Sequence, residues 1–401
     1  MLPTHAIPYA IPALWIQYDA TAIVQNFVDA KAAVLSLRAT PHQRDWVDKM
    51  QKLQLKMEVA GTSRIEGADF TERELDAALD IGKKAEDLAT RSQRQARAAA
   101  ETYRWIAAVP DDHPVTENLV LDIHRRLVIG CDDDHCPPGR LRVLDENVTF
   151  GFPRHRGCAG GQPCAQAFSA LIKALQTEYR VHDPLIQAMA LHYHFAAMHP
   201  FLDGNGRTAR ALEALLLQRA GLRDTAFIAM SNYYYEEKPA YLNVLAEVRS
   251  RNHDLTPFIK FGLKGIAVQC DRLFKEIKGH IQIAVFRNVM YDLFNHLQSP
   301  KKRVIALRQM AILKILLDTH EITLSDLIKR TTATYGTLQN ANKARIRDVN
   351  ALIALGAINA KRTGAGRWNI GINLDWPEQI TESDFMERVN KLPKSKMHSF
   401  L

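Results

Sequence analysis

The sequence predicts a mainly α-helical protein with a short β-hairpin and a C-terminal α+β domain of the winged helix-turn-helix type. Apolar residues recur with helical periodicity over 185–198 and again over 211–217. A Gly- and Pro-rich stretch, 131–164, encloses a partly alternating segment at 141–152, which favours a hairpin. After residue 300, helical patterns give way to a strand, a turn and a strand over 357–370, the order found in winged helices.

Changes in these patterns divide the 401 residues into five expected parts. A chain of this length can form two or three domains, each with its own core. Gly67 is a natural stop for one helix, and 71–74 read as a capping box for the next. We expect a helical region over 1–110, a core over 111–265, a connecting helix over 266–300, a winged helix over 301–375 and a tail over 376–401.

The bulk composition is that of a water-soluble globular protein. Apolar residues make up 47% and charged residues 24% of the chain. The chain contains no run of about 18 apolar residues, so we expect no membrane span and no membrane partner. The N-terminus lacks the basic and apolar regions of a secretory signal. Five cysteines are an odd and small number, which indicates a reducing compartment, and we expect a cytoplasmic protein.

The cysteine-containing segment also raises the question of zinc. It contains Cys131, Cys136, Cys158 and Cys164, together with His135 and His155. These spacings are looser than those of structural zinc pairs, so the sequence does not favour a zinc site there.

Positive charge is concentrated near the C-terminus. The net charge is +8, and residues 301–373 alone hold 13 Lys and Arg against 4 Asp and Glu. Such a segment suits a polyanion such as nucleic acid, although a solvated basic face is the simpler interpretation. Lys361 and Arg367 fall on the expected wing, and Arg345 and Arg347 fall on the helix before it. Contact with DNA and docking of a protein are both open expectations for this domain.

The segment with the clearest chemistry reads His199-Pro-Phe-Leu-Asp-Gly-Asn-Gly-Arg-Thr-Ala-Arg210. Pro200 disfavours helical geometry at His199, so the preceding helix must end there. The residue types of 204–206 tolerate positive φ, and successive amides in such a turn can form an anion-binding nest. A helix that starts at about Arg207 would direct its free N–H groups toward the same place.

Charged side chains complete this predicted anion site. Arg207 and Arg210 lie three residues apart on the expected first turn, and guanidinium groups suit polyphosphate oxygens. Asp203 borders the loop, where a carboxylate can hold a hard cation such as Mg²⁺. The residues by themselves therefore predict a site for a polyphosphate and a metal, next to a histidine.

This segment resembles the signature of the Fic family, His-x-Phe-x-(Asp/Glu)-Gly-Asn-Gly-Arg-x-x-Arg, and it matches every defined position. The resemblance extends over about 110–265 and includes 138–142, 147–148, 185–198 and 254–258. It implies a Fic-type helical core with a hairpin flap. The kinase-like branch of the family departs at the second glycine, which Gly206 retains, so nucleotidyl transfer is favoured.

The resemblance implies that AMP passes from ATP to a Tyr, Thr or Ser hydroxyl of a protein, with release of pyrophosphate. His199 would be the general base and Asp203 would bind Mg²⁺. The implied ATP-binding residues are Gly204, Asn205, Gly206, Arg207, Thr208, Ala209 and Arg210 of the signature, Phe150, Gly151, Phe152 and Pro153 of the flap, and Tyr241 near the adenine. The flap would also grip the target by β-augmentation. For Tyr241, core packing is an equally good interpretation.

Residues 62–67 resemble the inhibitory motif of the family, (Ser/Thr)-x-x-x-Glu-(Gly/Asn). The resemblance implies that Glu66 pairs with Arg210 and keeps ATP misplaced. Glu66 stands in the last turn of an expected helix, where the dipole mildly disfavours a negative charge. A solvent-facing glutamate or a pair with Arg64 is the plain alternative. Some relatives use this glutamate to remove AMP, so the reverse activity stays open.

We therefore expect an autoinhibited protein adenylyltransferase with ATP and Mg²⁺ as substrate and cofactor. Its partners would be a protein target and, as further options, the chain itself through 233–235 and a second copy in a homodimer. The alternative is a DNA-binding transcriptional regulator whose core senses nucleotide.

Overall fold

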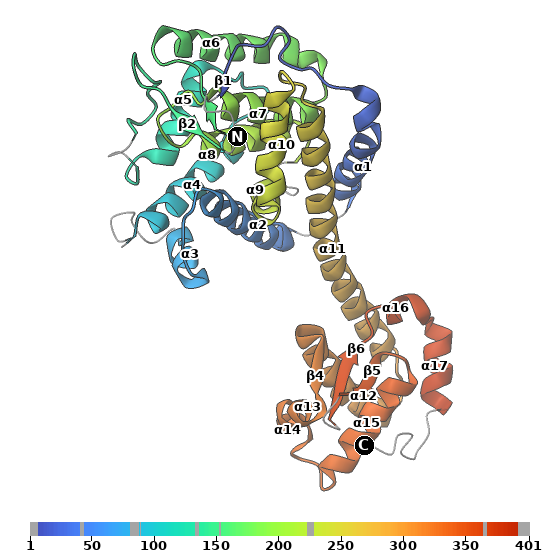
Figure 1. The fold of residues 1–401 in the computed structure, drawn as a ribbon. Helices are drawn as coiled ribbons and strands as arrows, with labels where there is room; N and C mark the ends of the chain where they lie inside the picture. The colour runs from blue at the N-terminus through green and yellow to red at the C-terminus, as the bar shows by residue number, and fades with distance from the viewer. Residues whose placement is uncertain are drawn as a thin grey trace. The chain divides into compact units, whose positions relative to one another are not determined.

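The computed structural model describes residues 7–40, 44–80, 88, 90–132, 136–151, 154–222, 228–363 and 367–391. The chain forms two compact units, 1–275 and 276–401, and the boundary falls inside one long helix, α11 (Thr256–Asn295). Both units are mainly helical, and each contains one three-stranded sheet (Figure 1). The predicted mainly helical class is confirmed. No helix of the described part is both long and apolar enough to span a membrane.

The centre of unit 1 is a helix pair, α7 (Pro184–Met198) and α8 (Asn205–Arg219), packed against each other. Most side chains of α7 are apolar and buried, as expected of a helix surrounded on all sides. The other helices of the unit are α1 (Ala20–Ala39), α2 (Arg44–Ile65), α3 (Glu72–Leu79), α4 (Arg91–Ala108), α5 (Glu117–Val128), α6 (Gln162–Gln176), α9 (Met230–Glu236), α10 (Lys238–Ser250) and the 3₁₀ turn Glu178–Val181.

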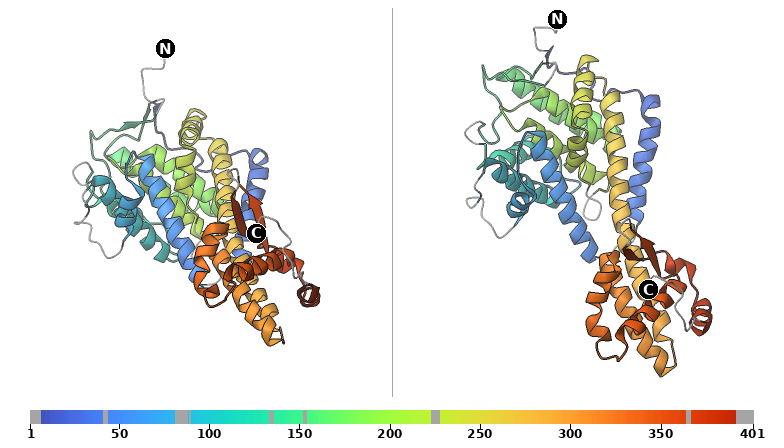
Figure 2. Two further views of the ribbon diagram at one scale, coloured as in Figure 1. Left: turned by 90° about the horizontal axis from the view of Figure 1, so that it is seen from below. Right: turned by 60° about the horizontal axis from the view of Figure 1, so that its bottom comes forward.

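The N-terminal helices pack around this centre. Helix α2 packs on α9 and α4, and α1 runs beside the first half of α11 (Figures 1 and 2). The amide of Asp19 donates to Thr256 Oγ1 over 2.8 Å and fixes the start of α1 against α11. Thr71 and Glu74 form the predicted capping box of α3.

Backbone hydrogen bonds at the end of α2 fix the position of Glu66. Gly67 adopts φ 88°, which a glycine tolerates without strain. The amide of Ala68 donates to Ser63 O over 3.0 Å and the amide of Gly67 donates to Arg64 O over 3.1 Å, the two bonds of a Schellman motif. The helix therefore ends at Ile65, as the position of Gly67 predicted, and Glu66 is the residue that caps it.

The sheet of unit 1 contains a hairpin that lies further along the chain than expected, because only its first strand falls within the predicted segment 141–152. Strand β2 (Thr149–Phe150) pairs antiparallel with β3 (His155–Arg156). Strand β1 (Ile7–Pro8) adds in parallel to β3, so the order is β1-β3-β2 and β2 lies at the edge. No local pattern predicts β1, because a strand of two residues is too short to show alternation.

Unit 2 has the order of elements that the winged-helix prediction requires. They are α12 (Pro300–Thr319), β4 (Glu321–Thr323), α13 (Leu324–Arg330), α14 (Thr332–Tyr335), α15 (Ala341–Ala354), β5 (Ile358–Arg362), β6 (Trp368–Ile372), α16 (Trp376–Gln379) and α17 (Glu382–Lys391). The strands form an antiparallel sheet in the order β4-β6-β5. A continuous apolar core includes Leu313, Leu352 and Trp376. This arrangement is compatible with a winged helix-turn-helix.

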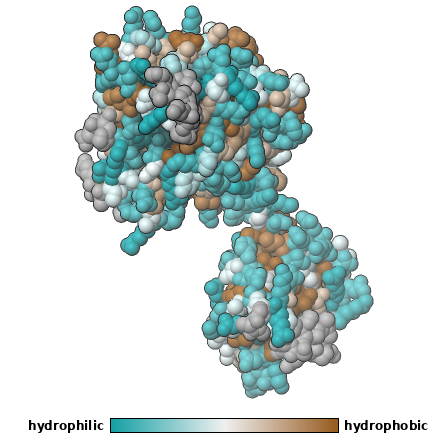
Figure 3. All heavy atoms as spheres, in the orientation of Figure 1, coloured by the Kyte–Doolittle hydropathy of each residue, from teal (hydrophilic) through white to brown (hydrophobic). Residues whose placement is uncertain are grey.

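Hydrophilic residues cover most of the face of the molecule seen in Figure 3, and apolar residues appear there in smaller separate groups. Such scattered apolar exposure is normal for a folded protein and marks no particular site.

Candidate active site

The loop between α7 and α8 is fixed by its own residues. His199 caps α7 in the left-handed conformation, with φ 53°. The side-chain amide of Asn205 accepts a hydrogen bond from Phe201 N and donates one to Phe201 O, both over 2.9 Å. Gly204, with φ 75°, is the N-cap of α8. The helix thus begins at Asn205, two residues before the predicted start, because the positive φ falls at the first glycine and not at the second.

The N-terminus of α8 has backbone N–H groups that could bind an anion. Gly204 has no side chain that could cap the helix. The N–H groups of the first turn, 205–207, have no acceptor within the helix, and the helix dipole adds positive potential there. These are the groups that the sequence predicted to hold phosphates, although Asn205 contributes as a helical residue.

A cavity of about 390 Å³ opens beside this helix end and His199. The residues that line it come from distant parts of the sequence of unit 1 and include Glu66, Phe150, Gly151, His199, Asp203, Asn205, Gly206, Arg210 and Tyr241. Gly204, Arg207, Thr208 and Ala209 are not part of this lining. The side chains of Thr208 and Ala209 are fully buried. Phe152 and Pro153 of the expected flap lie outside the described residues.

His199 is held as a neutral imidazole with one nitrogen available. Nδ1 lies 2.6 Å from Ala196 O, so this nitrogen carries the proton and donates it, which leaves the lone pair on Nε2. The ring stacks on Phe150 with centroids 3.8 Å apart. Burial lowers the pKa of His199 to about 4. The imidazole is therefore unprotonated at neutral pH and can accept a proton at Nε2.

Arg142 ties the hairpin to this loop. Its buried guanidinium donates to His199 O over 2.8 Å, to Glu146 O over 2.6 Å and to Cys158 O over 2.6 Å. Three backbone segments thus share one cation, which fixes the position of His199 relative to the strands β2 and β3.

Asp203 has a fixed backbone and a side chain 44% exposed. His124 accepts from the amide of Gly139 at Nδ1 over 2.9 Å, so its other nitrogen is protonated and donates to Asp203 O over 3.1 Å. The same ring stacks on Phe201 with centroids 3.6 Å apart. Asp203 Oδ1 accepts from Gly204 N over 2.6 Å, and Oδ2 lies 3.7 Å from the nearest nitrogen of Arg207. The exposed carboxylate borders the cavity.

One carboxylate fits a Mg²⁺ ion that arrives with a nucleotide. Mg²⁺ retains water ligands and is commonly bound through one or two carboxylates and phosphate oxygens. No group of three or more His, Cys, Asp or Glu side chains that could hold a metal occurs among the described residues. A cation at Asp203 would therefore depend on phosphate oxygens for its other ligands.

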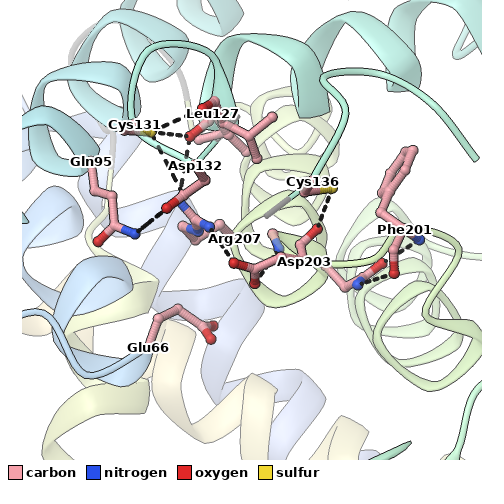
Figure 4. A network of polar contacts seen from close by, with 12 residues as sticks. Glu66, Gln95, Leu127, Cys131, Asp132, Cys136, Phe201, Asp203 and Arg207 are labelled. Carbon is pink, nitrogen blue, oxygen red and sulfur yellow. Dashed lines mark hydrogen bonds and ion pairs between the residues drawn. The ribbon is translucent and has the colours of Figure 1, made fainter. Parts of the chain in front are cut away.

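Arg207 is engaged by a second carboxylate that the sequence did not single out (Figure 4). Its guanidinium is 3% exposed, lies 2.5 Å from Asp132 Oδ2 and donates to Leu127 O over 3.3 Å. Asp132 is fully buried and also contacts Arg91 Nη2 at 2.6 Å and Gln95 Nε2 at 2.9 Å. The guanidinium of Arg207 therefore points toward Asp132 and does not line the cavity.

Arg210 contacts the glutamate that the sequence predicted. Its Nη2 lies 2.6 Å from Glu66 Oε1, and Nε donates to Thr62 Oγ1 over 2.9 Å. Burial raises the pKa of Glu66, but the charge and hydrogen bond of Arg210 outweigh this and lower it overall. Glu66 is therefore ionised and paired with Arg210, and not with Arg64.

Glu66 also lies beside the N-terminus of α8. A Cβ on Gly206 would lie 2.3 Å from Glu66 Oε1, so only glycine allows the carboxylate this close to α8. The negative charge lies at the end of α2 but faces the positive end of α8. The expected penalty at its own helix end is thus offset by the neighbouring helix.

Near Arg210, buried polar side chains form a hydrogen-bond network. Glu213 of α8 hydrogen-bonds His192 and accepts from Tyr234 OH over 2.9 Å. His192 Nε2 in turn lies 2.8 Å from Tyr241 OH. Tyr241 is 2% exposed and stacks on Tyr234, with ring centroids 4.7 Å apart. Tyr241 thus packs in an aromatic core, as one sequence interpretation expects, and it also lines the cavity. Its expected position near the adenine stays a prediction. Glu213 was visible as the single polar residue of 211–217.

Glu213 makes stability depend on pH on the alkaline side. Burial raises its pKa from 4.5 to about 8, and burial raises that of Glu58 to about 7. A raised carboxyl pKa contributes stability that is complete below pH 4.5 and is lost as pH rises through the folded-state pKa. Buried histidines with lowered pKa act in the opposite direction, but only below about pH 6.5, the pKa of an unfolded histidine. In the window from pH 6.5 to 8 the two carboxyls, and not the histidines, therefore make stability fall as the pH rises.

We expect Glu213→Gln, which stays neutral, to flatten the fall of Tm between pH 6.5 and 8. The wild type should lose up to about 1.4 kcal/mol per pH unit through this one group. Thermal unfolding at half-unit pH steps measures the slope. Glu72→Gln, at an exposed carboxylate, is the control and should keep the wild-type slope. Equal slopes for the wild type and Glu213→Gln would contradict the assignment.

The fold and the cavity together define a helical protein in which a histidine lies beside the N-terminus of a helix. Residues 114–217 match the Fic/DOC family, and the chain therefore contains a Fic domain. The protein adenylyltransferase Fic of Nematostella vectensis is 36% identical over 155 residues, which cover 37% of this chain and 31% of that protein. The protein of the same name from Aedes aegypti is 37% identical over 166 residues, which cover 41% and 30%. The chain thus spans less than a third of these relatives.

Solved structures show the same fold. A Fic family protein from Desulfovibrio desulfuricans aligns with a TM-score of 0.53 at 19% identity, over 92% of this chain and 98% of its own. Fic-1 from C. elegans aligns with a TM-score of 0.52 at 19% identity, over 64% of this chain and 72% of its own. The predicted Fic-type helical core is confirmed.

Proposed function

We propose that this chain is a protein adenylyltransferase, which transfers AMP from ATP to a Tyr, Thr or Ser hydroxyl of a protein. The observation that carries the proposal is one cavity that brings together Nε2 of His199, the open N-terminus of α8, Arg210 and the carboxylate of Asp203. The names of the relatives support it, because two proteins that each match about two fifths of the chain are called protein adenylyltransferases.

Four parts of this site have a task in the proposed reaction: the first amides of α8, Arg210, His199 and Asp203. The amides at the start of α8 and Arg210 bind the polyphosphate. His199 accepts the proton of the target hydroxyl at Nε2, and the hydroxyl oxygen then bonds to the α-phosphorus while pyrophosphate leaves. Mg²⁺, held by Asp203 together with phosphate oxygens, would neutralise charge between the phosphates. Arg207 would need to exchange Asp132 for the nucleotide before it could contribute.

The hairpin supplies a place for the target backbone. Strand β2 lies at the edge of its sheet, and Phe150 covers one face of the His199 ring. An extended segment of the target that pairs with this edge would bring its hydroxyl next to His199. The odd, small number of cysteines supports a reducing, cytoplasmic setting for this reaction.

The resting site is inhibited by Glu66 in this proposal. Its carboxylate forms an ion pair with the guanidinium of Arg210 and lies beside Gly206, where phosphate oxygens would bind. A bound triphosphate would place like charges at close range, which costs free energy in a partly buried site. ATP is therefore expected to bind weakly or in an unproductive position until Glu66 moves.

Labelled ATP tests the reaction. The full chain, wild type and Glu66→Gly, is incubated with Mg²⁺ and ATP labelled at either the α- or the γ-phosphate, with cell extract as the source of targets. Covalent label on protein from α-labelled ATP alone supports AMP transfer. Label from γ-labelled ATP alone would show phosphoryl transfer and overturn the proposal, as would the absence of label from both donors in Glu66→Gly.

A further inference from the structure

Unit 2 carries a surface on which positive charge is not balanced. Residues 329–367 contain eight Lys and Arg but one carboxylate, Asp348. Asp348 is 1% exposed and pairs with Arg308 Nε at 2.8 Å. Its other oxygen lies 4.0 Å from Arg347 Nε, so Asp348 offsets part of the charge of Arg347 from inside the domain. Seven of the cations are exposed: Lys329, Arg330, Lys343, Arg347, Lys361, Arg362 and Arg367. Lys329 forms an ion pair with Asp326 at 3.2 Å, so the unbalanced charge is that of the other cations.

Helix α15 presents one part of this surface. Asn342, Lys343 and Arg347 are exposed, and Gln339 and Asn340 are exposed just before the helix. Arg345, an expected contact residue, is instead 5% exposed, because its Nε donates to Thr331 Oγ1 over 2.9 Å and its guanidinium lies 4.9 Å from the centre of the Tyr335 ring. Arg345 therefore fixes α15 against α14, and Arg347 remains on the outside.

The β5–β6 hairpin presents the other part. Arg362 pairs with Trp368 and Lys361 with Asn369 in the antiparallel register. Lys361, Arg362 and Arg367 are exposed at the open end of this hairpin. Thr363 N donates to Arg367 O over 2.8 Å, which holds the two strands together at that end.

We propose that unit 2 binds duplex DNA, with the exposed face of α15 in the major groove and the end of the β5–β6 hairpin on the phosphates. The order of α13, α15, β5 and β6 is that of helix-turn-helix domains, in which the second helix enters the groove. The amides of Gln339, Asn340 and Asn342 and the guanidinium of Arg347 are the groups that read base edges. The lysines and arginines of the hairpin neutralise backbone charge.

The surface favours DNA over other polyanions. An α-helix fits the wide major groove of B-DNA, whereas the deep, narrow major groove of duplex RNA excludes it. An acidic protein could pair with the lysine and arginine side chains. It would not offer the side-chain amides of Gln339, Asn340 and Asn342 the hydrogen-bonding pattern of base edges. The activity lies in unit 2 alone, so it is additional to AMP transfer and independent of His199.

Fluorescence anisotropy with a labelled 30-base-pair duplex tests this inference on the full chain. We expect binding whose affinity falls steeply with salt, with a slope of log K against log[salt] near −0.9 for each phosphate contacted. The variant Lys343→Gln/Arg347→Gln should bind at least about tenfold more weakly, and Lys361→Gln/Arg362→Gln should lower the salt slope by about 1 to 2. These side chains are exposed, so the fold, checked by circular dichroism, should persist.

The matched control is Lys49→Gln/Lys52→Gln, which removes two exposed lysines of α2 and should bind DNA like the wild type. His199→Ala should also bind normally, which separates this result from the fate of the proposed enzyme activity. Equal loss in the control, unchanged binding in Lys343→Gln/Arg347→Gln, absence of binding at low salt, or tighter binding to duplex RNA than to DNA would each overturn the inference.

Discussion

Replacing Glu66 by glycine is expected to raise the rate of label transfer from α-labelled ATP by at least about tenfold, which corresponds to about 1.4 kcal/mol. The substitution removes a carboxylate that lies 2.6 Å from Arg210 and beside the first turn of α8. Both Arg210 and the helix amides then become available to the nucleotide. Glu66→Gln removes the charge but keeps a hydrogen-bond acceptor for Arg210, so its gain should be intermediate.

The same variant gives a readout that needs no target protein. Glu66→Gly leaves the 2% exposed guanidinium of Arg210 without a carboxylate, and an unpaired buried charge is destabilising. We therefore expect Glu66→Gly to have a lower Tm than the wild type without ligand and a larger rise in Tm with ATP and Mg²⁺. Glu72→Gln, which removes an exposed charge nearby, should match the wild type in both measurements. Equal shifts with ATP in the wild type and Glu66→Gly would contradict the inhibitory role.

Features encoded within a few residues could be predicted from the sequence. The end of α2 follows from Gly67, the cap of α3 from Thr71 and Glu74, and the end of α7 at His199 from Pro200. The start of α8 was wrong by two residues, because Gly204 and Gly206 are equally able to adopt positive φ and the sequence does not show which one does. The choice is made by Asn205, whose amide bonds both backbone groups of Phe201.

Partners distant in sequence could not be predicted in this way. Asp132 is one of three consecutive aspartates, and only the packing of α5 against α8 selects it as the partner of Arg207. The pairing of β1 with β3 joins residues about 150 positions apart and has no local signature. The prediction that Glu66 pairs with Arg210 rests only on the resemblance to the Fic family. Nothing in residues 62–67 by themselves indicates which cation Glu66 contacts.

Removing the imidazole of His199 is expected to reduce label transfer by about 10²- to 10⁴-fold, the usual contribution of a general base. The comparison is best made in the Glu66→Gly background, where the starting rate is highest. Nucleotide binding should persist, because α8 and Arg210 form the phosphate site, so the ATP-induced rise in Tm should stay within the range of the parent. A loss of rate with retained binding identifies a group that acts in the chemical step.

The backbone of residue 199 requires a second variant. His199 has φ 53°, and alanine is strained there, whereas asparagine adopts this conformation readily. His199→Asn should therefore keep the Tm of the parent and still lose the activity, and His113→Ala, at an exposed histidine, should lose neither. The pH profile adds an independent test: with its pKa lowered to about 4, the imidazole is a competent base above pH 4, so activity dependent on it falls only as the pH drops through about 4. If His199→Asn were nearly as active as the parent, His199 would not be the general base, and another group that lines the cavity would have to accept the proton.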